Sequence, residues 1–239
     1  MSVSFYTAKT GVIQSQQALD VTSNNIANVS TSGFKPLRPS FSDLIYTVRH
    51  ADNEDTETGH GAKMEKTDLM YDAGGLTQTA RELDFAIVGE GTFAIQQTDG
   101  DVVYSKNGSF QIQENDGAWN LIDAQGGKVL DYTGNPVVLA YNEDGTVDSA
   151  KLKNDIGVFI FENPYGLDPE GNNYFIATDS SGEAAADLVM EKKSGYLEAS
   201  SSNLADQMVK VIQYQKAFSF NAKMVQTADQ LENIINNLR

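Results

Sequence analysis

The strongest constraint on the fold of this 239-residue chain is an apolar residue at every seventh position near both of its ends. An apolar heptad repeat marks one side of a helix, and that side must be buried against another helix. We therefore predict one helix over residues 3–29 and a second over residues 203–238, with Asn203 as a cap of the second. The predicted subunit-interface residues on these helices are Phe5, Val12, Leu19, Ile26, Leu204, Met208, Val211, Phe218, Ala222 and Val225.

Charge separates the two ends of the chain from its middle. Residues 1–50 carry a net charge of +2 and residues 201–239 a net charge of +1, whereas residues 51–200 carry −19. An acidic middle argues against nucleic acid as a partner, because phosphate binding requires clustered Lys and Arg side chains. The pattern predicts two adhesive terminal helices joined by an acidic, well-solvated globule, which suits a self-assembling subunit better than an enzyme.

Composition removes several classes of protein. The chain contains no cysteine, which excludes disulfides, thiolate catalysis and cysteine-based metal sites. Its apolar content of 40% is too high for general disorder. No apolar run approaches the roughly 20 residues of a membrane span, so we expect no membrane insertion. The first residues lack a basic region followed by an apolar one, so we expect no Sec-type signal peptide.

The middle of the chain changes character twice. A dense helix-stop signal at residues 28–36 ends in Pro36, and the polar residues that follow predict an extended arm or a mobile linker. From Gly75 onward, short apolar runs alternate with turn pairs of the kind that connect β hairpins. The predicted turns are Asp99-Gly100, Asn107-Gly108, Asp116-Gly117, Gly126-Gly127, Gly134-Asn135 and Asp144-Gly145.

Together these patterns predict an α+β chain. Paired, coiled-coil-like terminal α-helices flank an inserted all-β domain of the barrel or sandwich kind. We expect the N-terminal helix of an axial helical domain in residues 1–35 and its C-terminal helix in residues 201–239. Between them we expect an extended arm in residues 36–74 and the β domain in residues 75–200.

Patterns of catalytic and metal-binding residues are weak. His50 and His60 are the only histidines, and they lack the spacing of a helical zinc site. Gly89-Glu90-Gly91 lacks the spacing and the following helix of a phosphate loop. We therefore expect no enzyme activity and no catalytic, cofactor-binding or metal site. A carboxylate pair of the glycosidase type stays open as an alternative, because carboxylates are abundant.

Several blocks of the sequence resemble bacterial flagellar rod and hook proteins, and they occur in that family's order. The N-terminal block is Asn24-Asn25-Ile26-Ala27-Asn28-Val29-Ser30-Thr31-Ser32-Gly33-Phe34-Lys35. The middle blocks are Leu83-Asp84-Phe85-Ala86-Ile87-Val88-Gly89-Glu90-Gly91 and Tyr104-Ser105-Lys106-Asn107-Gly108-Ser109-Phe110. The C-terminal blocks are Gly195-Tyr196-Leu197-Glu198-Ala199-Ser200-Ser201-Ser202-Asn203 and Gln226-Thr227-Ala228-Asp229-Gln230. In the N-terminal block, the resemblance makes Asn25, Asn28, Gly33 and Phe34 the residues of the family's motif turn.

Within this family the chain is most similar to the basal-body rod proteins. The resemblance implies a structural subunit that is exported through the flagellar type III apparatus and polymerises into a torque-transmitting rod. That rod would cross the periplasm or cell wall, and the partners would be copies of the chain and other rod and hook proteins. Thr92, Lys106 and Lys216 depart from the residues frequent in the family, which leaves distal and proximal rod types both open.

Three other functions stay open at this point. A flagellar hook-type subunit shares the same sequence blocks. A wall-cleaving hydrolase would use a carboxylate pair, and its activity would be lost in acid-to-amide variants. A non-flagellar adhesin would use the terminal helices only for oligomerisation.

Overall fold

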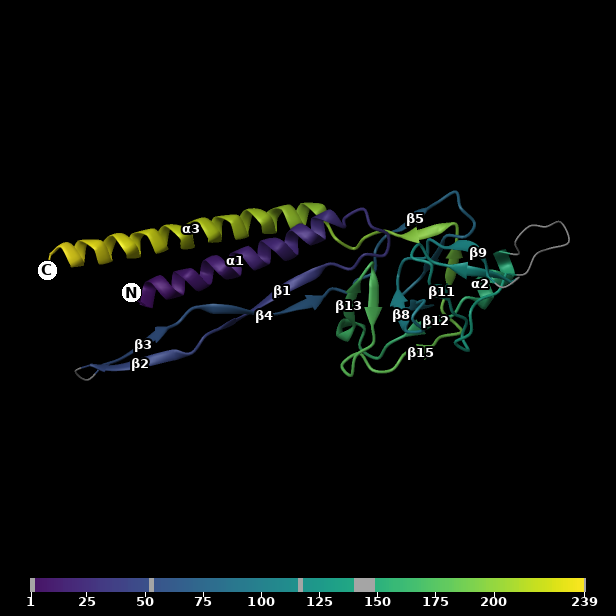
Figure 1. The fold of residues 1–239 in the computed structure, drawn as a ribbon, viewed down its shortest axis with the longest axis horizontal. Helices are drawn as coiled ribbons and strands as arrows, with labels where there is room; N and C mark the ends of the chain where they lie inside the picture. The colour runs from purple at the N-terminus through teal and green to yellow at the C-terminus, as the bar shows by residue number, and fades with distance from the viewer. Residues whose placement is uncertain (1–2, 52–53, 116–117, 140–148, 239) are drawn as a thin grey trace. The chain divides into compact units, whose positions relative to one another are not determined.

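The chain forms two compact units, which the computed structural model describes for residues 3–51, 54–115, 118–139 and 149–238 (Figure 1). Unit 1 comprises Met1–Ala27, Leu37–Asp68 and Asn203–Arg239, and unit 2 comprises Asn28–Pro36 and Leu69–Ser202. The turns predicted at residues 116–117 and 144–145 lie outside the described residues.

Two long helices dominate unit 1. They are α1 (Val3–Ala27) and α3 (Leu204–Asn237), which confirms both predicted helices. The cap predicted for the second helix is also confirmed, since the Asn203 side chain accepts the N–H of Ala205 at 2.9 Å. The helices lie side by side in opposite directions, so that both chain ends are at the same end of unit 1 (Figure 1).

The rest of unit 1 is a β hairpin, which lies within the range predicted as an extended arm or a mobile linker. Strand β1 (Leu37–Asp43) pairs with β4 (Ala62–Leu69), and between them β2 (Tyr46–Ala51) pairs antiparallel with β3 (Glu54–Gly59). Where the two pairs meet, the N–H of Leu44 donates to the carbonyl of Gly61 at 2.8 Å. Strand β1 contacts α1, whereas Tyr46 and Val48 on β2 are exposed.

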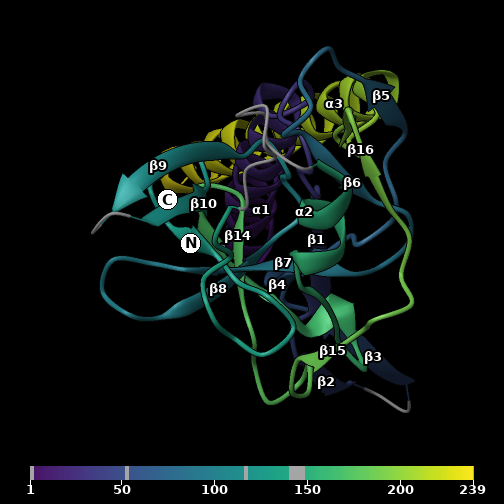
Figure 2. The ribbon, with the colours of Figure 1, turned by 90° about the vertical axis from the view of Figure 1, so that its right-hand side faces the viewer.

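Unit 2 is built on one antiparallel sheet (Figure 2). Among the described residues its main path runs in the order β13, β14, β8, β7, β11, β10, β9, while β12 pairs with both β7 and β15. The bounds are β7 Thr92–Gln96, β8 Val102–Ser105, β9 Gln111–Asn115, β10 Ala118–Ile122, β11 Lys128–Val129, β12 Val158–Ile160, β13 Asp168–Gly171, β14 Tyr174–Ile176 and β15 Ala185–Ala186. Two smaller antiparallel pairs join β6 (Phe85–Ile87) to β16 (Lys192–Ser194) and β5 (Leu76–Gln78) to β17 (Tyr196–Glu198).

The core of unit 2 shows that the prediction of an all-β middle is wrong. The core includes the fully buried side chains of Phe85 on β6, Phe93 on β7 and Phe110, which directly precedes β9. It also receives Leu152 from a short helix, α2 (Ser149–Asp155), and a further 3₁₀ turn spans Pro164–Gly166. Leu152 and Ile156 are both buried and four residues apart, which is helical spacing, and the N–H of Ile156 donates to the carbonyl of Leu152.

The predicted turns had mixed outcomes. Asp99-Gly100 does connect an antiparallel hairpin, β7–β8, but in a longer loop, in which the N–H of Gly100 donates to the carbonyl of Gln97 and Gly100 has φ +95°. Asn107-Gly108 is not a hairpin turn, because β8 pairs with β7 and β14, and the carbonyl of Gly108 accepts the N–H of Phe85. Gly126 and Gly134 each close a turn through a backbone hydrogen bond three residues back.

Candidate assembly site

Small and polar side chains form the buried side of α1 in unit 1. The buried residues of this helix are Ala8, Ser15, Ala18, Thr22 and Asn25. Small side chains allow two helix backbones to approach closely, as at Gly11, where an added Cβ would lie 2.6 Å from the Asn221 side chain of α3. The contact between the two helices within one chain is therefore close at this position.

The large apolar residues of the predicted seam lie beside this contact. On α1, Phe5, Val12, Leu19 and Ile26 are all half-buried, and on α3 the same is true of Val211, Phe218, Ala222 and Val225. Leu204 and Met208 are exposed, at 44% and 56% of their surface. The single chain therefore leaves much of the predicted interface uncovered.

The heptad pattern did not identify a second set of apolar residues on α3 and at its C-cap, Leu238. We call it the outer stripe, and every member is more than half exposed. It consists of Phe220, Met224, Leu231, Ile234, Ile235 and Leu238. Steps of three, four and seven residues between its members place them on one broad side of the helix. Such spacing is visible in the sequence, but only when the search is not limited to a strict period of seven.

Asn25, the first residue of the motif turn, fixes the base of unit 1. Its side chain accepts the N–H of Leu37 at 2.9 Å and donates to the carbonyl of the same residue at 2.7 Å. It also donates to the side-chain oxygen of buried Gln207 on α3 at 3.4 Å. One buried amide thus joins the end of α1, the start of β1 and the first turns of α3. Both ends of an amide must be satisfied in this way when it is buried.

The other motif-turn residues belong to the motif loop, which we define as residues 28–36 of unit 2. Thr31 donates through its backbone N–H to the carbonyl of Asn28 and through its hydroxyl to the Asn28 side chain. Gly33 has φ +70°, and a Cβ there would lie 2.7 Å from the backbone of Lys106, so only glycine fits. The carbonyl of Phe34 accepts the N–H of Ser201 at 3.1 Å.

Beneath the motif loop lies a buried group of three charged side chains, Lys35, Lys106 and Glu198, which we call the charge cluster. The Glu198 carboxylate is 2.6 Å from the Lys35 ammonium and 3.1 Å from that of Lys106. All three side chains are at most 2% exposed. Each residue comes from a different block of the family resemblance, so the fold brings the N-terminal, middle and C-terminal blocks together within unit 2.

The remaining partners of the charge cluster come from the backbone and one aromatic ring. Lys35 donates to the carbonyl of Asp72 at 2.6 Å, and the N–H of Gly74 donates to Glu198 at 2.8 Å. The ring of buried Tyr71 lies 5.2 Å from the ammonium nitrogen of Lys35, within the range of a cation–π contact. A second ammonium, that of Lys106, lies 5.8 Å from the same ring.

The protonation of the charge cluster follows from its burial and charge balance. Burial alone would raise the pKa of the Glu198 carboxyl, but Lys106 and Lys35 outweigh burial and hold this pKa below its ordinary 4.5. Burial lowers the pKa of the Lys106 ammonium by more than its attraction to Glu198 restores. Burial also raises the pKa of Tyr71 well above 10.0. Glu198 is therefore ionised at neutral pH.

Replacing Glu198 by Gln is expected to lower the free energy of opening of the motif loop by on the order of 3–5 kcal/mol at pH 7, because two buried ammonium groups lose their counter-charge. A carboxyl whose pKa is lowered by folding contributes stability above its unfolded pKa, near 4.5, and loses it as pH falls through the folded value. Amide exchange of Gly33 in both chains, compared at each pH from 7 to 3, should show the difference shrinking below about pH 4.5. Glu191→Gln, at an exposed position, is the matched control. A difference that does not depend on pH would contradict the assignment.

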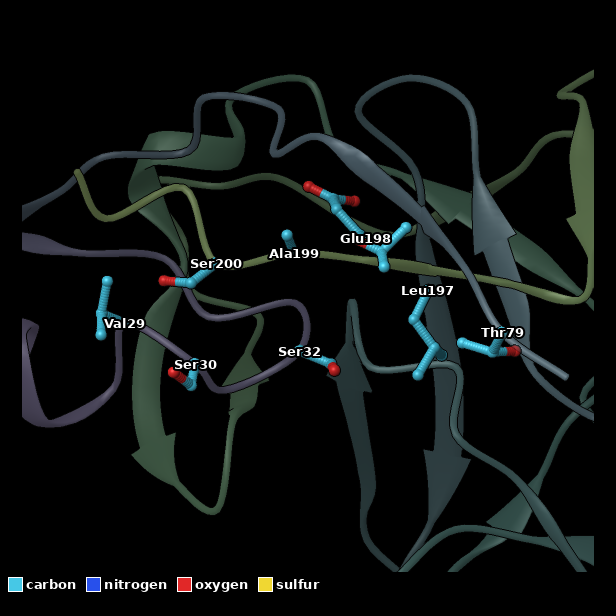
Figure 3. Close-up of a pocket in the computed structure, with 9 residues that line it drawn as sticks. Val29, Ser30, Ser32, Thr79, Leu197, Glu198, Ala199 and Ser200 are labelled. Carbon is cyan, nitrogen blue, oxygen red and sulfur yellow. The ribbon is translucent and has the colours of Figure 1, made fainter. Parts of the chain in front are cut away.

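A shallow pocket of about 280 Å³ lies next to the motif loop in unit 2 (Figure 3). Val29, Ser30 and Ser32 line it from the loop, and the segment from Leu197 to Ser200 lines it from the C-terminal side. Leu197 and Glu198 point to opposite sides of their strand, as neighbouring strand residues do. Besides Glu198 of the charge cluster, the lining residues are serines, threonines and apolar residues.

In the described part of the chain, His, Asp and Glu side chains do not gather in any group of three suited to holding a metal ion. Within the same residues, no helix combines the length and the apolar character that a bilayer crossing needs. The side chain of His60 contacts the hydroxyl of Thr47 at 3.0 Å in the hairpin of unit 1.

Family models match three parts of the chain. A model described as "Flagella basal body rod protein" matches residues 5–35, which contain α1 and most of the motif loop. A model described as "Flagellar basal body rod FlgEFG protein C-terminal" matches residues 193–238, which contain β17 and α3. Between them, "Flagellar hook protein FlgE/F/G D1 domain" matches residues 86–156 in unit 2.

Individual relatives match over nearly their whole length. The flagellar basal-body rod protein FlgG of Borreliella burgdorferi is 33% identical over 268 residues, covering 100% of this chain and 99% of the relative. FlgG of Bacillus subtilis is 30% identical over 264 residues, covering 99% and 98%. The flagellar hook-basal body complex protein FlhP of Bacillus subtilis is 27% identical over 270 residues, covering 99% of both. The chain belongs to the family of flagellar basal-body rod proteins.

Proposed function

We propose that this chain is a structural subunit of the flagellar basal-body rod and that it polymerises through its terminal helices. The observation that carries the proposal is the outer stripe of α3, whose six large apolar residues are all more than half exposed. A contiguous apolar surface of this kind favours a protein partner, because leaving it in water costs free energy. Its place on one of the two long helices favours another helix as that partner.

Polymerisation follows from the geometry of such a contact. The outer stripe and the half-buried apolar residues of α1 are different surfaces on the same chain. A contact between two different surfaces is head-to-tail, and it builds an open helical filament when the rotation does not close into a ring. In this proposal the helices pack into a coiled-coil-like tube, and the hairpin of β1–β4 links successive subunits so that the rod transmits torque.

The distribution of charge supports assembly through the helices of unit 1 and not through unit 2. Unit 2 contains 22 acidic and 8 basic residues and carries a net charge of −14, whereas unit 1 carries −2. Mutual repulsion of acidic surfaces opposes contacts between the β-rich units of different copies. It thereby favours assembly through the nearly neutral helices. The proposed partners are copies of this chain, other rod and hook proteins and the flagellar type III export apparatus.

A hook-type subunit is the second candidate. One specific observation favours it, since the model that matches residues 86–156 is described as a hook protein domain. The relative FlhP also carries a name that refers to the hook-basal body complex. The relatives named as rod proteins are more similar in sequence, which favours the rod.

The decisive experiment locates the subunit. In a strain that lacks the chain's own coding region, expression of an epitope-tagged chain should restore swimming. Antibody labelling of isolated basal bodies by electron microscopy should then place the tag on the rod. Labelling along the hook would support the hook-type subunit instead. Swimming by the deletion strain without any complementation would contradict both assignments.

A further inference from the structure

Hydrogen bonds join the segments of unit 2 at which the chain enters and leaves that unit. The chain passes between units after residues 27, 36, 68 and 202. On the unit 2 side, the N–H of Met70 donates to the carbonyl of Pro36 at 2.9 Å, and the N–H of Gly33 donates to the carbonyl of Glu198 at 2.7 Å. The motif loop is thus held both by the segment that follows β4 and by the C-terminal strand β17.

Because of the charge cluster, the contacts that hold the motif loop depend on Glu198. Lys35 and Lys106 repel each other, and Glu198 is the only carboxylate within ion-pair distance of either ammonium among the described residues. Glu90 also attracts Lys106, but from an exposed position. The Tyr71 hydroxyl, which faces the same group, has no hydrogen-bond partner in the described chain and supplies no charge at neutral pH. Without Glu198 the two buried ammonium groups would be left with the backbone carbonyls of Asp72 and Gly89 and the uncharged ring of Tyr71.

The positions of these residues in the sequence show that the motif loop, near the N-terminus, depends on a residue much later in the chain. Lys35 and Lys106 precede Glu198 by 163 and 92 residues, so their counter-charge comes from near the C-terminal end of unit 2. The core of unit 2 around Phe93 and Phe110 contains none of the three residues. The core can therefore be complete while the motif loop still lacks its partner.

We propose that docking of Glu198 orders the motif loop, so that the residues after α1 and those before α3 become fixed together in one step. In this conformational coupling, the carboxylate of Glu198 on β17 acts as a positioning residue for the motif loop. It makes the N-terminal block unable to reach its final arrangement until the C-terminal block is in place. The proposal concerns the isolated chain and holds whether or not that chain functions in a rod.

Amide hydrogen exchange on the purified full-length chain tests the proposal. In Glu198→Gln, the amides of Gly33, Gly74 and Ser201 should exchange about tenfold faster or more than in the parent chain. Amides of β7, in the core of unit 2, should keep their rates. The matched control Glu191→Gln removes an exposed carboxylate seven residues away and should change none of these rates. Glu198→Asp retains the charge on a shorter side chain, so it should fold and give a smaller acceleration at the same amides.

Three results would overturn the proposal. The first is unchanged exchange of the motif loop in both Glu198 variants. The second is an equal acceleration in Glu191→Gln. The third is an acceleration in Glu198→Asp that is uniform across the motif loop and β7, because Glu198 would then stabilise unit 2 as a whole. If Glu198→Gln does not fold, Glu198→Asp alone decides between these results and the proposal.

Discussion

Removal of residues 203–239 is expected to abolish incorporation of the chain into basal bodies while leaving unit 2 folded. The deletion removes α3 entirely, together with the outer stripe, but it ends at the boundary of unit 2, whose last residue is Ser202. Unit 2 keeps all of its core, its sheet and Glu198. The shortened chain should therefore retain exchange protection of β7 and β8 in the purified protein, and basal bodies from cells that express it should contain none of it.

Two outcomes would count against this division of the chain. Loss of β7 protection would mean that α3 is required for the fold of unit 2. Incorporation of the shortened chain would mean that the assembly contacts lie elsewhere. Secretion has to be measured in parallel, because a chain that is not exported cannot be incorporated. Equal amounts of the parent and shortened chains in the culture medium of a strain without rods provide that control.

The helices were predictable because their signals are local. Each signal lies within a short stretch of sequence. The signals are an apolar residue at every seventh position, a stop signal that contains Gly and Pro, and an Asn at the N-cap. What the heptads did not reveal is which side of α1 faces α3. Close approach of two backbones selects for small residues such as Ala18, so the buried side of the helix is its less hydrophobic one. A search for large apolar residues therefore finds the half-covered side.

Strand boundaries were predictable to a lesser degree. Asp99-Gly100 connects β7 to β8 because these neighbouring strands also pair with each other. Asn107-Gly108 has an equally good turn signal, yet its carbonyl is taken by Phe85, which lies more than twenty residues away in sequence. The four-residue spacing of Leu152 and Ile156 is a helical signal, but it consists of only two residues in a stretch that follows several turn signals. Long-range pairing decides such positions, and it leaves no local trace.

The charge cluster illustrates what one sequence cannot disclose. Lys35, Lys106 and Glu198 each stand in a block that resembles the flagellar family, but nothing in their spacing predicts that the three side chains meet. Charged residues are most often exposed, and a buried lysine cannot be distinguished from an exposed one by its neighbours in sequence. The three-dimensional arrangement is needed to show that the motif loop is held by a carboxylate from β17.

Leu231→Asp is expected to eliminate swimming without changing the stability of the isolated chain. Leu231 is 54% exposed in the outer stripe, so a carboxylate at this position remains solvated in the free subunit. If the stripe is buried between subunits, the same carboxylate would lose its water without gaining a partner, at a cost on the order of several kcal/mol per contact. A rod repeats the contact many times, so assembly should fail.

Gln226→Asp is the matched control for that variant. It introduces the same charge in the same half of α3, and Gln226 is also exposed, but it lies about 140° around the helix from Leu231 at roughly 100° per residue. Thermal unfolding should be the same for both variants and the parent chain within about 0.5 kcal/mol. Swimming speed and basal-body content should fall only in Leu231→Asp. If Gln226→Asp stops swimming and Leu231→Asp does not, the contact between subunits lies on the polar side of α3 and the proposed role of the outer stripe is wrong.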